Sequence, residues 1–224
     1  EKINIRDKEI EMCKKALELL TNARGLRTTL LENMEQSMRK HGFNVKIDTD
    51  HGVISLPEQV LFPSGSNQLQ EAGKKMLSIL AEVLYANLKT HTFNASGTSA
   101  FSNIILPDDI QPSYVEAVFI EGHTDNVPTG KSSPFRDNWD LSTARSFTTY
   151  KSLMEAQPSL NQLLNESRHP IFSVSGYAEF RPVASNDSEE GRTLNRRIDI
   201  RIIMSPPKVS KTGFEIDFLE FWKN

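Results

Sequence analysis

Two short polar stretches of the sequence combine residue types that can hold a charged ligand. The first, residues 121–128, reads Glu-Gly-His-Thr-Asp-Asn-Val-Pro and directly follows an apolar run typical of a buried strand. The ends of such strands are where α/β sheets commonly bind ligands. The second, residues 138–145, reads Asn-Trp-Asp-Leu-Ser-Thr-Ala-Arg and opens a predicted helix, whose free N–H groups and dipole favour an anion.

Asp125 and Arg145 are the two residues of these stretches with the most specific chemistry. The planar guanidinium of Arg145 can bind a carboxylate through two hydrogen bonds, and the carboxylate of Asp125 can bind an ammonium group. Together they predict a site for a zwitterion, an amino-acid-like group that carries both charges. The alternative is a salt bridge between the two side chains that braces the loop.

A third polar stretch, residues 191–197, reads Gly-Arg-Thr-Leu-Asn-Arg-Arg and precedes the last predicted strand. Its paired arginines, Arg196 and Arg197, could bind an anion or cover the edge of the sheet. The sequence alone favours neither role.

The clustered titratable residues do not favour catalysis. A glycan hydrolase needs two carboxylates that flank a sugar, one of them with a raised pKa. A metal enzyme needs at least three ligands, and only His123 and Asp125 are expected on one side of the strand end. We therefore expect no enzyme, no metal site and no cofactor. His123 is interpreted as a structural side chain that is hydrogen-bonded in the turn.

The hydrophobic pattern predicts the elements that position these stretches. Alternating or continuous apolar runs predict strands at residues 43–47, 53–56, 115–121, 171–176 and 197–204. The last strand should bury one face and leave the other in water. A three-and-four spacing predicts helices at residues 66–89 and 142–157, with a helical turn at 160–164. Ser66 or Asn67 is the expected cap of the first of these helices. Because strands and helices interleave, we expect an α/β fold, a two-layer α+β sandwich with a mixed sheet.

The first 41 residues also read as helix. Its first apolar stripe consists of Ile3, Ile10, Cys13, Leu17 and Leu20. A second stripe in a new phase, at Leu31, Met34 and Met38, ends near Gly42. The narrow stripe is typical of a coiled-coil seam and predicts a helix that links or pairs two copies of the chain, while the alternative is a helix that folds back on the domain.

We divide the chain into a helical linker or dimerisation segment (1–42), a domain (43–204) with an insertion at about 91–113, and a tail (205–224) that packs on the domain.

The composition excludes several classes of protein. The 224 residues are 38% hydrophobic and 25% charged, as in ordinary globular domains. Lysine and arginine number 26 against 29 acidic residues, and the net charge of −3 argues against nucleic acid as a partner. A single cysteine excludes an internal disulfide, and no apolar run is long enough to cross a bilayer. Because the chain starts at Glu1, we expect that a preceding piece, which could hold a membrane segment, lies outside it.

Five motifs in fixed order carry a family resemblance: residues 122–126, 138–145, 176–177, 181–183 with Asn186, and 195–197. They resemble the OmpA-like peptidoglycan-binding domain, and residues 61–66 with Leu69 resemble that family's first strand-to-helix passage. The resemblance spans about residues 43–204. Within the family, residues 127–128 and 138–142 resemble most the MotB-type stator subunits of ion-driven motors, a group that includes the stator-like ZorB subunit of Zorya anti-phage systems. Those proteins join a short cytoplasmic end, one transmembrane helix, a periplasmic linker and this domain.

The resemblance implies a mixed four-stranded sheet behind an N-terminal linker helix. It also implies non-catalytic binding of the peptidoglycan stem peptide, with Asp125 on the ammonium and Arg145 on the carboxylate of the diaminopimelate side chain. The residues that match positions in or beside that pocket are Thr124, Asp125, Asn126, Asn138, Leu141, Arg145, Asn195 and Arg196.

The resemblance further implies the cellular context. It indicates the periplasmic portion of an inner-membrane protein, a homodimer that anchors an ion-driven motor of flagellar or Zorya defence type to the cell wall and works with a MotA-like membrane subunit. The alternatives are an OmpA- or Pal-like wall-binding protein associated with the outer membrane, or a cell-wall hydrolase. The insertion and the tail rich in Phe and Trp depart from the family pattern and leave the partner surfaces open.

Overall fold

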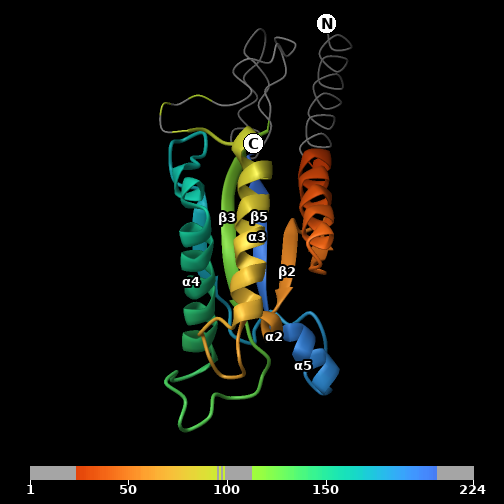
Figure 1. Cartoon of the computed structure of the whole chain (residues 1–224). Coiled ribbons are helices and arrows are strands. Elements are labelled where there is room, and N and C mark those ends of the chain that lie inside the picture. The colour runs from red at the N-terminus through yellow and green to blue at the C-terminus, as the bar shows by residue number, and fades with distance from the viewer. Residues whose placement is uncertain (1–23, 95, 97, 99–112, 206–224) are drawn as a thin grey trace, which may run out of the picture.

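The computed structural model of the chain describes residues 24–94, 96, 98 and 113–205, and their centre is one open sheet (Figure 1). The strands are β1 (Lys46–Asp48), β2 (Val53–Pro57), β3 (Val115–His123), β4 (Phe172–Gly176) and β5 (Arg197–Met204), in the order β1-β2-β5-β3-β4. Only β3 and β4 pair in parallel; the other neighbours in this sheet are antiparallel. The mixed sheet agrees with the prediction, but it has five strands instead of four, because both arms of the first hairpin join it.

Two long helices, α3 (Glu71–Leu88) and α4 (Asn138–Ala156), lie side by side over one face of the sheet (Figure 1). The shorter helices are α2 (Glu58–Leu61), η1 (Lys89–His91), η3 (Pro158–Gln162) and α5 (Glu189–Asn195). The sequence pattern did not predict α5. The predicted cap of α3 was wrong: the hydroxyl of Ser66 accepts from the N–H of Gln68 within a turn, and Gln70 is the N-cap. Helix α4 begins at Asn138, earlier than the predicted 142, because Asp137 is its N-cap and accepts from the N–H of Asp140.

The core lies between the sheet and the helix layer. Its fully buried members include Ile54, Leu56, Val118, Ile120, Ile200 and Ile202 from the strands and Leu77, Leu80 and Leu84 from α3. Residues 24–40 form a helix whose Leu31, Met34 and Met38 belong to the same core. This part of the predicted linker therefore folds back on the domain. The first apolar stripe, with Ile10, Cys13, Leu17 and Leu20, lies outside the described residues.

The opposite face of the sheet carries charged side chains, and several of them are buried instead of exposed to water. The prediction that β5 leaves one face in water was wrong for Arg197 and Asp199, which are buried because they pair with each other at 2.9 Å. Most of the predicted insertion and the tail beyond residue 205 lie outside the described part of the chain. Within the described part, no helix is both long and apolar enough to span a membrane.

Candidate functional site

Strand topology brings two acidic residues to one edge of the sheet. Both β2 and β3 pair antiparallel with β5, so they run parallel to each other and end at the same edge. Glu58 directly follows β2, and Asp125 lies just beyond β3. The loop after α2 and the first turns of α4 reach the same edge, and these segments enclose a cleft of about 810 Å³. In Figure 1 this is the end of the sheet where α2 and α5 lie.

Two glycines allow α4 to approach the sheet closely enough to reach the cleft. Gly122 and Gly176 are paired neighbours near the ends of β3 and β4. A Cβ atom on Gly122 would collide with the backbone carbonyl of Ser142, and one on Gly176 would collide with the hydroxyl of Thr143. The close contact places the first turns of α4, including Arg145, against the cleft.

Four buried or half-buried charges form a chain across the cleft. Arg196 donates to Asp125 at 2.5 Å, and Arg145 donates to Glu58 at 2.7 Å. The Nε atom of Arg196 lies 4.0 Å from the second oxygen of Glu58, which links the two pairs. Glu189, which also lines the cleft, pairs with Arg196 at 2.7 Å, so three carboxylates meet two guanidiniums. The cleft therefore presents both signs of charge at close range, which suits a ligand that is itself a zwitterion.

Arg145 is held in place by the protein on several sides. Its side chain is 3% exposed, its Nε donates to the carbonyl of Ser66 at 2.8 Å, and its guanidinium lies 5.5 Å from the ring centre of Phe62. Burial raises the pKa of the Glu58 carboxyl and lowers the pKa of Arg145, although each charge favours the ionised form of the other. Because Nε and Nη2 bind protein acceptors, Nη1 is the remaining donor group for a ligand.

The Asp125 loop is braced by hydrogen bonds. One oxygen of Asp125 accepts from the N–H of Val127 at 2.9 Å, and the other accepts from Arg196. Asn138, in the first turn of α4, donates to the carbonyls of Asp125 and Val127 at 3.2 and 3.1 Å. The loop therefore presents the carboxylate from a fixed position.

Two buried polar atoms of described residues at the cleft make no hydrogen bond. Among the described residues, the Oγ1 of Thr124 and the Oε2 of Glu58 are buried without a hydrogen bond, and both residues line the cleft. A buried polar group left unpaired costs about 1–3 kcal/mol. A ligand that donates to the Glu58 oxygen and bonds to the Thr124 hydroxyl removes that cost.

The structure gathers most of the residues that the sequence suggested. Those that line the cleft are Thr124, Asp125, Asn138, Leu141, Arg145 and Arg196. Asn126 is exposed, and neither it nor Asn195 lines the cleft. Asp125 and Arg145 do not form the bracing salt bridge with each other, because each has another partner. Sequence reasoning missed Glu58, which follows the predicted strand at 53–56 after one residue but has no neighbouring motif that marks it as part of a site.

Asn195 has a structural role instead. It is fully buried; its Oδ1 accepts from the N–H groups of Val183 and Ala184, and its Nδ2 donates to the carbonyl of Ala184 and to Asn186. Asn195→Ala is expected to lower the free energy of unfolding by about 2–4 kcal/mol, since several buried groups lose their partners. Urea denaturation measures this change. Unchanged stability together with lost ligand binding would instead make Asn195 a ligand contact.

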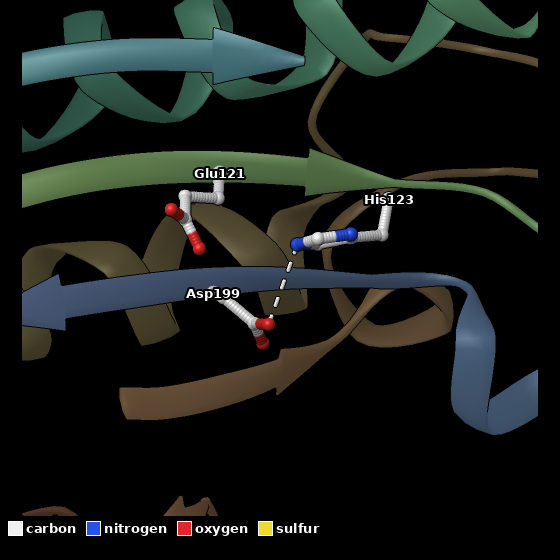
Figure 2. Close-up of side chains that lie close together, drawn as sticks. All are labelled: Glu121, His123 and Asp199. Carbon is white, nitrogen blue, oxygen red and sulfur yellow. Dashed lines mark ion pairs between the residues drawn. The ribbon is translucent and has the colours of Figure 1, made fainter. Parts of the chain in front are cut away.

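A second group of charged residues lies on the outer face of the sheet. Glu121 and His123 from β3 and Asp199 from β5 point toward one another (Figure 2). The Nε2 of His123 lies 3.3 Å from an Asp199 oxygen. Arg201 binds both oxygens of Glu121 at 2.7–3.0 Å, and Arg197 binds Asp199. His123 and Asp199 also line a separate cleft of about 490 Å³.

His123 differs from its prediction as a residue hydrogen-bonded in the turn. Both ring nitrogens are buried, and neither has a hydrogen-bond partner among the described residues. The ring stacks on Tyr177 with 5.4 Å between ring centres. Burial, and then the charges of Arg197, Arg181 and Arg201, lower the pKa of His123 to about 3.

This lowered pKa predicts a pH-dependent stability. Between about pH 3 and 6.5 the unfolded chain binds a proton on His123 that the folded chain does not, so the free energy of unfolding rises with pH across this window. The contribution of His123 should fall by about 2 kcal/mol from pH 7 to pH 5. Urea unfolding of His123→Gln, in buffers free of metal, should show a correspondingly smaller pH dependence. An equal slope in both proteins would contradict the shift.

The comparisons with known proteins agree with this architecture. The chain is 26% identical over 181 residues to motility protein B of Bacillus subtilis (strain 168), covering 77% of this chain and 56% of that protein. The chain is homologous to motility protein B. Motility protein B of Helicobacter pylori (strain J99) is 33% identical over 98 residues, which cover 44% of this chain and 34% of that protein. No protein-family model matches.

Solved structures show the same fold. A MotB-like protein from Desulfovibrio vulgaris superposes with a TM-score of 0.59 at 20% identity, covering 83% of this chain and 98% of that one. The cell wall anchor of the T6SS from Pseudomonas aeruginosa gives a TM-score of 0.50 at 22% identity, covering 79% and 96%. The fold is thus that of the MotB-like, OmpA-type domains. The chain spans about half the length of the curated motility protein B that it matches over most of its own length.

Proposed function

We propose that this MotB-like domain anchors a membrane protein to the cell wall by binding the peptidoglycan stem peptide in the cleft beside Asp125 and Arg145. The observation that carries the proposal is the chain of four alternating charges, which presents both signs at close range in the cleft. A diaminopimelate side chain offers a free ammonium and a free carboxylate on one carbon, and so it matches a site that offers both signs at close range.

The contacts suggest which protein groups bind the ammonium and which bind the carboxylate of the ligand. The ammonium is assigned to Asp125 and to the unpaired oxygen of Glu58, since both are buried acceptors at the cleft. The carboxylate is assigned to the remaining donor of Arg145. Thr124 contributes its unpaired hydroxyl, and Leu141 walls the site with apolar surface. Arg196 holds the Asp125 carboxylate in a fixed orientation before the ligand arrives.

Anchoring is a holding function that needs affinity rather than turnover. In this proposal the chain is a periplasmic portion of a membrane-anchored stator subunit that pairs with a second copy and works with a MotA-like membrane subunit. Two domains joined in one dimer raise the effective affinity for the wall, because the second binding event becomes intramolecular. The relatives named for motility favour a motility motor over a defence motor.

The direct test is sedimentation with purified peptidoglycan. The protein should appear in the pellet, and the supernatant should contain no soluble muropeptides. Protein that stays in the supernatant contradicts wall binding, and released muropeptides would identify a hydrolase. Competition by a soluble stem peptide that contains diaminopimelate tests the proposed ligand group. The matched control is the same peptide with lysine in place of diaminopimelate, because the lysine side chain keeps the amine and lacks the second carboxylate.

A further inference from the structure

The outer face of the sheet holds three metal-ligand side chains at close range. Glu121 and Asp199 are directly opposite each other in the β3–β5 ladder, and His123 follows on the same face of β3. One ligand atom from each residue lies within 4.8 Å of the others, and all three residues are buried. Ligand atoms in a tetrahedral zinc site lie about 3.3 Å apart, so a small inward movement of the side chains would complete such a geometry.

His123 gives an independent reason to expect a ligand here. Its side chain is 1% exposed and points into the group, and neither ring nitrogen has a hydrogen-bond partner among the described residues. Its Nε2 is already 3.3 Å from Asp199, close to the separation of two donors on one metal ion. A bound cation would give the imidazole a partner, and the cleft that His123 and Asp199 line offers a path from solvent.

We propose that Glu121, His123 and Asp199 bind a divalent transition-metal ion of the zinc type, which ties β3 to β5 on the outer face of the sheet. One imidazole nitrogen and two carboxylate oxygens form a donor set that suits Zn²⁺, with the remaining position open toward the cleft. This site is separate from the proposed peptidoglycan cleft and does not depend on that function.

Neighbouring arginines compete with a metal ion for the carboxylates of Glu121 and Asp199. Arg201 binds both oxygens of Glu121, and Asp199 accepts from Arg197 and from the Ser55 hydroxyl, so the metal must share or displace these partners. The side chain of Arg201 is 24% exposed and can move toward solvent, whereas that of Arg197 is 9% exposed. Arg201 is therefore the competitor whose removal should free a ligand.

Because Arg201 competes with the metal ion, variants of the metal ligands and a variant of Arg201 should change the Zn²⁺ affinity in opposite directions. In calorimetric titration of the chelator-treated full chain with Zn²⁺, the wild type should bind one ion, and His123→Gln or Asp199→Asn should weaken binding at least tenfold. Arg201→Met should strengthen it, and Zn²⁺ should raise the melting temperature of this variant more than that of the wild type. Circular dichroism checks that each variant is folded.

His51→Gln is the matched control. His51 and Asp48 form an exposed pair, 2.8 Å apart, that lines the same outer cleft and could bind Zn²⁺ at the surface. This variant should bind Zn²⁺ as the wild type does, and Co²⁺ should give the visible absorption of a tetrahedral site that His123→Gln lacks. The proposal is overturned if the wild type shows no saturable binding, if His123→Gln binds normally, or if His51→Gln abolishes binding.

Discussion

Asp125→Asn is expected to weaken binding of a soluble diaminopimelate stem peptide by about 30-fold to several thousand-fold, which corresponds to about 2–5 kcal/mol for loss of one partner of a desolvated charge pair. The change keeps the shape of the side chain and the oxygen that accepts from Val127, but it removes the charge that faces the ligand ammonium and Arg196. Isothermal titration with the peptide measures the affinity, and urea unfolding establishes that the domain is intact.

The matched control for this variant is Asp50→Asn. Asp50 pairs with Arg24 at 2.9 Å, but its side chain is 75% exposed and it does not line the cleft. The same chemical change there should leave peptide affinity and stability at the wild-type level. If Asp125→Asn binds the stem peptide as tightly as Asp50→Asn does, the assignment of Asp125 to the ammonium is wrong.

Arg145→Met is expected to lower the free energy of unfolding by about 3–5 kcal/mol, because it leaves the Glu58 carboxylate buried without its partner. The two side chains are only 3% and 6% exposed, so water cannot replace the lost interaction. The double variant Arg145→Met with Glu58→Gln removes both charges and should recover much of that loss. Urea unfolding of the wild type, Arg145→Met, Glu58→Gln and the double variant at neutral pH measures the coupling between the two residues.

This coupling decides how binding data on Arg145 must be interpreted. Loss of sedimentation by Arg145→Met alone could reflect a damaged fold, whereas loss by the stable double variant would indicate missing ligand contacts. Arg136→Met is the control, since Arg136 pairs with Asp140 on the surface and its side chain is 85% exposed. It should leave stability and peptide affinity unchanged. A double variant no more stable than Arg145→Met would show that Glu58 is not the cause of the destabilisation.

The location of the cleft could be predicted from the sequence, but the ion pairs between its charged side chains could not. Polar residues placed directly after an apolar run indicated a site at a strand end, and Arg145 follows from its position in the first turns of α4. The partner of Arg145 depends on which strands end at the same edge, and that is a property of the sheet order. Glu58 therefore became recognisable only once β2 and β3 were placed on the two sides of β5.

The contacts between charged side chains on the outer face of the sheet also could not be predicted from the sequence. The alternation along β5 correctly separated apolar from polar residues, yet it could not tell that Asp199 would lie opposite Glu121 and beside His123. Without that neighbour, His123 was interpreted as a turn residue. In the N-terminal helix the change of phase between the two apolar stripes was informative, because Met34 and Met38 of the second stripe are the residues that join the core.

The direction of the strands has a mechanical consequence for an anchor. The helix of residues 24–40 begins at the end of the sheet opposite to α2, α5 and the cleft, and the strands run between these two ends (Figure 1). Under the proposed anchoring function, a tensile load between residue 24 and a wall peptide bound in the cleft would therefore act along the strands and shear the hydrogen bonds between β2 and β5 together. Shearing requires many bonds to break at once, whereas a load across the strands would peel them apart one by one.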